Sequence, residues 1–161
     1  MMNGQESGLP MIAGRFFVVP WEFGTGHARS GTDVLSSKLL ISIAAGGAIG
    51  AVGRYVVATY VAQATAGEFP YGTLTVNIVG SLIMGALVAL LGVAWSPGPE
   101  VRAFLTTGVL GAFTTFSLFS LDLAAMIERG DMLSAGAYAT ASVLLCLGGF
   151  FLGNHLIRAL V

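Results

Sequence analysis

The sequence predicts an all-α integral membrane protein with four transmembrane helices, and three observations support that fold class. Apolar residues make up 55% of the chain, whereas charged residues make up only 9%. A water-soluble domain of this size carries many more charges on its surface, so the balance indicates lipid as the solvent. Four long apolar runs also follow one another, and the segments between them are short and contain turn-forming glycine and proline.

The four apolar runs cover residues 39–66, 72–95, 103–127 and 132–154. A helix needs ~20 apolar residues to cross the ~30 Å hydrocarbon core, so each run is long enough to cross once. Arg54 is the one charge in the first run and Asp122 the one acid in the third, while the second and fourth runs are uncharged. Backbone groups in lipid must bond internally, which favours helices. We therefore expect one four-helix domain over residues 38–161.

Residues 1–37 differ from the rest of the chain because they hold two prolines, several charges and many small polar residues. This composition predicts a flexible cytoplasmic extension, and a wrongly assigned start is the alternative. Four crossings place both ends of the domain on one side of the membrane. The basic residues Lys38, Arg102 and Arg158 mildly favour the cytoplasm for that side, so insertion in both orientations stays open.

Several classes of function find no support in the sequence. The net charge of −1 gives no electrostatic basis for binding nucleic acid. Cys146 is the one cysteine, which excludes an intrachain disulfide. His27 and His155 have no cysteine or carboxylate cluster around them in the sequence, so neither predicts a metal or catalytic site. We do not expect an enzyme.

Polar residues inside the apolar runs are the candidates for function, because burying them in lipid costs free energy. Asn77 lies in the middle of the second run and offers two N–H donors. A hydrogen bond between helices, worth ~0.6 kcal/mol, explains it equally well. In the fourth run Tyr138, Ser142 and Cys146 recur every four residues and therefore share one helical face. That face is either a packing surface or a wet track for an ion.

The third run contains the poorest helix-forming segment, since residues 108–115 include two glycines and paired threonines. This pattern predicts a break at mid-membrane depth, whose freed carbonyls could be satisfied by an alkali cation. Phe116 and Phe119 follow and project in similar directions. Their electropositive ring edges could face an anion, although contact with lipid or core is the commoner role of phenylalanine.

Three segments in the same order and spacing resemble one family. Residues 46–55, 72–81 and 108–117 resemble the bacterial fluoride channel family known as Fluc or CrcB, and the resemblance extends from about Lys38 to the last residue. It implies antiparallel, dual-topology homodimers of four-helix subunits, with two fluoride pathways along the subunit interface. It also implies passive fluoride export across the cytoplasmic (inner) membrane, which gives fluoride resistance. The expected partners are fluoride, membrane lipid and a second copy of the chain.

The resemblance also implies roles for individual residues. Arg54 matches an arginine at the aqueous vestibule, and the carbonyls of Gly111 and Thr114 match the ligands of a structural sodium ion between subunits. Cys146 stands where the family often has serine, and Leu118 stands where it often has threonine. The residues expected along the fluoride pathway are Asn77, Phe116, Phe119, Ser117, Tyr138, Ser142 and Thr73.

Two other interpretations stay open at this point. Small multidrug exporters are also four-helix dual-topology dimers, but their proton coupling depends on a glutamate in the first helix, where this chain has no acid. If Asp122 took that role, transport would depend on pH. An assembly subunit without transport would use the same small-residue pairs, such as Gly46 and Gly50, but it leaves Asn77 and the irregular third run unexplained. Pairing with a second homologue instead of itself is also conceivable.

Overall fold

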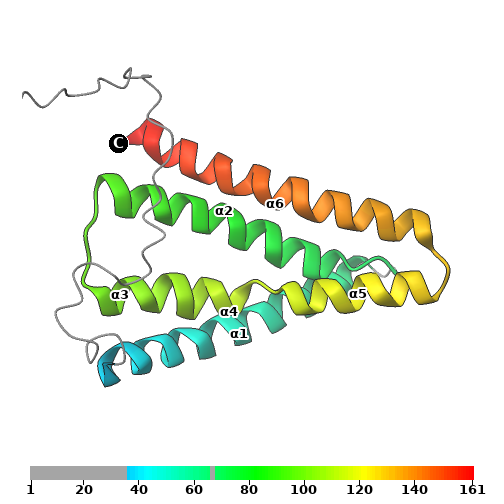
Figure 1. Ribbon diagram of the computed structural model, residues 1–161, viewed down its shortest axis with the longest axis horizontal. Helices are drawn as coiled ribbons and strands as arrows, with labels where there is room; N and C mark the ends of the chain where they lie inside the picture. Colours follow the sequence, from blue (N-terminus) through cyan, green and yellow to red (C-terminus); the bar gives the residue numbers. More distant parts are fainter. Residues whose placement is uncertain (1–35, 66–67) are drawn as a thin grey trace, which may run out of the picture.

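A computed structural model describes residues 36–65 and 68–161, and all regular structure in these residues is helical (Figure 1). The extension predicted for residues 1–37 lies almost entirely outside the described residues. Four helices are long and apolar enough to cross a membrane, which confirms the predicted multi-pass membrane fold. They are α1 (Ser37–Thr65), α2 (Tyr71–Val93), the third span (Pro99–Glu128) and α6 (Met132–Leu160).

The lengths of the spans suit a bilayer. α2 is the shortest, and its 23 residues extend about 35 Å at ~1.5 Å per residue, more than the ~30 Å hydrocarbon core. The third span begins at Pro99, ahead of the predicted run, because proline is favoured in the first helical turn, where its missing N–H breaks no bond. α6 begins after Gly130, whose φ of 79° makes the turn, and Asp131 caps its first turn by accepting from the Ser134 N–H.

The third span is irregular along its length. It consists of α3 (Pro99–Ala103), the π-helical η1 (Phe104–Leu110), α4 (Gly111–Phe113) and α5 (Phe116–Glu128). Between α4 and α5, Thr114 (φ −81°, ψ 160°) and Thr115 (φ −154°, ψ 121°) have extended backbone. The Thr114 N–H still bonds to the Leu110 carbonyl, but the Thr115 N–H bonds to a side chain instead, and helical structure resumes with α5.

Close packing of α2 on α6 depends on glycines. A Cβ on Gly85 would collide with the Phe150 carbonyl, and a Cβ on Gly153 would collide with the Leu82 carbonyl. The buried Asn154 side chain donates its Nδ2–H to the Gly85 carbonyl at 3.2 Å. Small residues let helix backbones approach in this way within a membrane. Figure 1 shows the result, with α6 lying along α2.

Glycines also bring α1 against the third span. A Cβ on Gly46 would collide with the Phe104 carbonyl, and a Cβ on Gly50 would collide with the Val109 carbonyl. Both glycines are buried and lie four residues apart, so they share one face of α1. This face fixes α1 beside η1 and α4, immediately before the extended residues of the third span.

Much of the apolar surface of the spans is not covered within the subunit. Only 11–22% of the residues in the apolar window of each span are buried. The buried cluster of Met126, Ala135 and Tyr138 joins α5 to α6 at one end of the bundle. Lipid or further protein must cover the remaining apolar side chains, because water would make their exposure costly.

Candidate functional site

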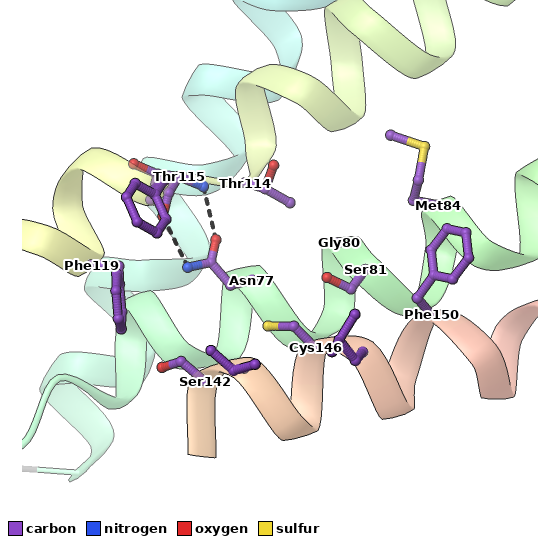
Figure 2. A pocket seen from close by; sticks show the side chains of 13 residues that line it. Asn77, Gly80, Ser81, Met84, Thr114, Thr115, Phe119, Ser142, Cys146 and Phe150 are labelled. Atoms are coloured by element: carbon purple, nitrogen blue, oxygen red, sulfur yellow. Dashed lines mark hydrogen bonds between the residues drawn. The ribbon is translucent and has the colours of Figure 1, made fainter. Parts of the chain in front are cut away.

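An open groove of about 440 Å³ runs between α2, the junction of α4 with α5, and α6 (Figure 2). Its lining combines an amide, hydroxyls and a thiol with aromatic and aliphatic side chains. Four of the predicted pathway residues line this groove together, which sequence spacing alone could not establish. The lining residues are Asn77, Gly80, Ser81, Met84, Thr114, Thr115, Phe116, Phe119, Ser142, Val143, Cys146, Leu147 and Phe150.

Asn77 joins α2 to the extended part of the third span. Its Nδ2–H donates to the Thr115 carbonyl at 2.9 Å, and its Oδ1 accepts from the Thr115 N–H at 2.8 Å. Figure 2 shows both bonds, which satisfy backbone groups that the interrupted helix leaves without their usual partners. An amide nitrogen carries two N–H groups, so Asn77 keeps one donor that Thr115 does not use. The bond between helices and a role as donor are therefore compatible.

The side chain of Thr115 starts α5. Its Oγ1 accepts from the Leu118 N–H at 3.2 Å, which is the N-cap bond of the helix. The Ser117 hydroxyl lies 3.1 Å from the same Oγ1. Ser117 is exposed and is not part of the groove lining. Its hydroxyl therefore stabilises the start of α5 in the single subunit.

Phe116, Phe119 and Tyr138 form a short file of rings. The centroids of Phe116 and Phe119 are 5.3 Å apart with an interplanar angle of 39°, and those of Phe119 and Tyr138 are 5.1 Å apart with an angle of 37°. Phe116 is 78% exposed although it is a large apolar side chain. The ring edges near the groove are electropositive, whereas the faces are electronegative.

Tyr138 and Thr73 are both buried and do not line the groove, although the Tyr138 ring contacts Phe119, which does. The Tyr138 side chain is fully buried, and its hydroxyl donates to Asp122 Oδ2 at 3.3 Å. The Thr73 side chain interacts with the same hydroxyl. The Tyr138 hydroxyl hydrogen is therefore already engaged in a hydrogen bond to a carboxylate. This pairing could not be predicted from the sequence, because Asp122 and Tyr138 lie on different spans.

Ser142 carries a hydroxyl without a partner. The residue is 7% exposed, it lines the groove, and its Oγ has no hydrogen bond within the part of the chain that the structure describes. Buried hydroxyls are normally paired, because an unpaired one costs roughly 1–3 kcal/mol. One turn further along α6, the half-buried Cys146 thiol interacts with the Ser81 hydroxyl. The groove thus holds an unused donor beside the free N–H of Asn77.

Ser81 is a lining residue that sequence reasoning missed, although a signal was present. Thr73, Asn77 and Ser81 recur every four residues on α2, as Tyr138, Ser142 and Cys146 do on α6. Residues with this spacing share a helical face. Comparing both runs for the same period would have predicted two polar faces, and the structure places Ser81 and Cys146 together (Figure 2).

The residues expected to hold a cation lie at the end of α4. The Thr115 N–H bonds to Asn77, so it does not continue the helical ladder to the carbonyl of Gly111, and Gly111 is exposed. The Thr114 carbonyl accepts from Arg54 Nη1 at 3.4 Å. Carbonyl oxygens freed from a helix are suitable ligands for an alkali cation, so these residues fit a sodium ion chemically. Arg54 does not line the groove.

Four membrane-length helices, with a polar groove beside an irregular third span, define the class of protein, which is a small multi-pass membrane protein. The chain belongs to the family described as CrcB-like protein, Camphor Resistance (CrcB), which matches residues 41–154. This match covers the four spans and the groove.

Curated relatives match the chain over nearly their whole length. The fluoride-specific ion channel FluC of Rhodospirillum centenum is 49% identical over 124 residues, which cover 77% of this chain and 98% of that protein. The fluoride-specific ion channel FluC 1 of Nitrobacter hamburgensis is 43% identical over 121 residues, with 75% and 96% covered. The FluC protein of Rhizobium meliloti is 45% identical over 122 residues, with 76% and 98% covered.

Proposed function

We propose that the chain is a fluoride-specific ion channel that lets fluoride leave the cell passively across the cytoplasmic membrane and thereby gives fluoride resistance. Relatives at 43–49% identity that are named fluoride-specific ion channels support this function. The observation that carries it within the structure is the buried, unpartnered Ser142 hydroxyl in the same groove as Asn77. A channel requires no covalent chemistry, so we assign no catalytic residue.

The donors of the groove suit the chemistry of fluoride. Fluoride is small and strongly hydrated, and it only accepts hydrogen bonds, so each lost water must be replaced by a donor. The free N–H of Asn77 and the Ser142 hydroxyl supply two such donors, and both groups line the groove. Larger halides need fewer strong donors and more space, so a narrow path with several donors favours fluoride.

The aromatic pair offers an anion a weaker contact than the hydrogen-bond donors of the groove do. The edges of Phe116 and Phe119 carry partial positive charge and attract an anion more weakly than an N–H or O–H donor does. Contacts of this strength attract an anion without holding it, which conduction requires. The Phe119 ring also contacts the tilted ring of Tyr138, so an anion moving along the rings would reach the tyrosine hydroxyl and Thr73 next. Ser117 joins this path only if its hydroxyl turns away from Thr115.

A second copy of the chain completes the pathway in this proposal. The groove is open along one side, and the 78% exposure of Phe116 leaves its ring available to a partner. An antiparallel homodimer agrees with the weak charge bias of the two ends, because each copy inserts in the opposite sense. In this arrangement Thr114 and Thr115 lie at mid-membrane depth, and two pathways run along the subunit interface.

A structural sodium ion at the dimer interface is part of the same proposal. The Gly111 and Thr114 carbonyls of each subunit would hold it, and the ion would neutralise the carbonyl ends of two interrupted helices. Arg54 lies at the same junction through its bond to Thr114. Its charge would raise the local concentration of anions near a vestibule.

Efflux from liposomes tests the function. Purified protein is reconstituted, and release of internal fluoride is followed with an ion-selective electrode, with chloride release under the same gradient as the control. We expect rapid fluoride release and slow chloride release. Equal release of both anions, or no fluoride release, would contradict the proposal. Asp122→Asn separates it from a proton-coupled exporter, since only an exporter driven through Asp122 would lose its response to a pH gradient.

A further inference from the structure

Arg54 continues the glycine face of α1 toward the interruption of the third span. Gly46, Gly50 and Arg54 are spaced by four residues and therefore share one face. The two glycines bring the α1 backbone against η1, and a Cβ on Gly50 would lie 3.1 Å from the Phe113 nitrogen. This close approach delivers the half-buried Arg54 side chain to Thr114, the first extended residue after α4.

The position of the guanidinium has an electrostatic meaning. The carbonyl end of a helix carries partial negative charge, because its last carbonyls lack intrahelical donors. At the end of α4 one of these donors is missing, because the Thr115 N–H bonds to the Asn77 side chain instead of to a helical carbonyl. Arg54 Nη1 donates to the Thr114 carbonyl at 3.4 Å from a residue 60 positions away in the chain. A full positive charge therefore faces the negative end of the interrupted helix.

We propose that Arg54 is the built-in cation of this helix break, a positioning residue that holds the Thr114 carbonyl and neutralises part of the charge at the end of α4. The inference rests on the proposed sodium site, because both cations act on the same carbonyl. In the intact protein the stability of the interrupted segment depends only partly on bound sodium, because Arg54 already supplies one positive charge. Without Arg54 the break depends on sodium alone.

Thermal unfolding in two salts tests this role without measuring transport. The purified protein is melted in detergent in sodium chloride and in choline chloride at equal ionic strength, and circular dichroism follows the helices. Arg54→Gln is compared with the wild-type chain, and Arg102→Gln serves as the matched control because Arg102 is exposed on α3. Arg54→Lys keeps the charge but loses the planar fork of donors.

We expect Arg54→Gln to melt at a lower temperature in choline and to recover in sodium, so that the stabilisation by sodium is about twofold larger than in the wild-type chain. Arg54→Lys should fall between the two, and Arg102→Gln should match the wild type. A packing role alone would lower melting equally in both salts, and this result would overturn the proposal. If Arg54→Gln fails to fold in either salt, Arg54→Lys decides: a loss of thermal stability that is equal in both salts counts against the proposal, and a loss that sodium recovers supports it.

The outcome is separable from the proposed function. If the melting temperature of every variant is the same in sodium and in choline, both the sodium site and the role of Arg54 are overturned. Fluoride efflux from wild-type liposomes is measured on the same preparations, and it can succeed while this inference fails. A failure of efflux, in turn, leaves the salt dependence of melting as independent evidence on Arg54.

Discussion

Replacing Ser142 with alanine should separate stability from transport. The side chain is 7% exposed, and its Oγ has no partner among the described residues, so folding buries a hydroxyl without compensation. Such a group costs roughly 1–3 kcal/mol. Ser142→Ala removes that cost and leaves a void no larger than one oxygen atom. We expect the free energy of unfolding to stay constant or rise by about 1 kcal/mol, while fluoride efflux slows.

The assay combines two measurements on the same preparation. Unfolding in mixed micelles of increasing sodium dodecyl sulfate is followed by circular dichroism, and efflux is followed with a fluoride electrode. Thr140→Ala is the control, because Thr140 is exposed on another face of α6 and does not line the groove. If Ser142→Ala lowers stability by more than ~1 kcal/mol, the hydroxyl has a structural partner and our reasoning fails. Unchanged efflux would equally remove Ser142 from the pathway.

Four further substitutions, one of them with a matched control, test other parts of the account. Asn77→Ala leaves two buried backbone groups without partners, so it should lower the unfolding free energy by roughly 2–4 kcal/mol and abolish efflux. Phe116→Ile removes the ring edges and should slow fluoride efflux by up to about tenfold with unchanged melting. Gly85→Ala drives a methyl group into a backbone carbonyl and should cost at least ~1–3 kcal/mol in unfolding experiments, whereas Gly92→Ala on the same helix meets nothing within 4 Å and should be tolerated. Hydrogen bonds from the side chain and the backbone N–H of its capping partner hold the pKa of Asp131 below its usual value. In melting experiments, Asp131→Ala should therefore be less stable than the wild-type chain above about pH 4. This difference should vanish as the pH falls through the pKa that Asp131 has in the folded protein.

The spans could be predicted from the sequence because lipid imposes a simple rule on long apolar runs. The charge-free runs at residues 72–95 and 132–154 correspond to α2 and α6. The irregular segment was also visible, since paired threonines and glycines are poor in a regular helix, and Thr114 and Thr115 have extended backbone. The π-helical η1 was not predicted, because its geometry comes from packing against α1 rather than from local preference.

The contacts of the site were harder to predict, because they join residues that are distant in the sequence. The sequence indicates Asn77 as a donor within the membrane, but its two hydrogen bonds with the Thr115 backbone depend on how α2 meets the third span. The bond from Tyr138 to Asp122 likewise depends on the packing of α5 on α6. Roles in a dimer lie beyond one subunit, so the pathway, the sodium ion and the vestibule stay predictions.

The reversal potential of the current across a planar bilayer tests the central claim most directly. The reconstituted protein separates two solutions with a tenfold fluoride gradient, equal chloride and, in a second run, a pH gradient. A passive fluoride pathway predicts reversal at the fluoride equilibrium potential of about 59 mV in magnitude, with no response to pH. A reversal near zero, or one that moves with the pH gradient, would contradict the account.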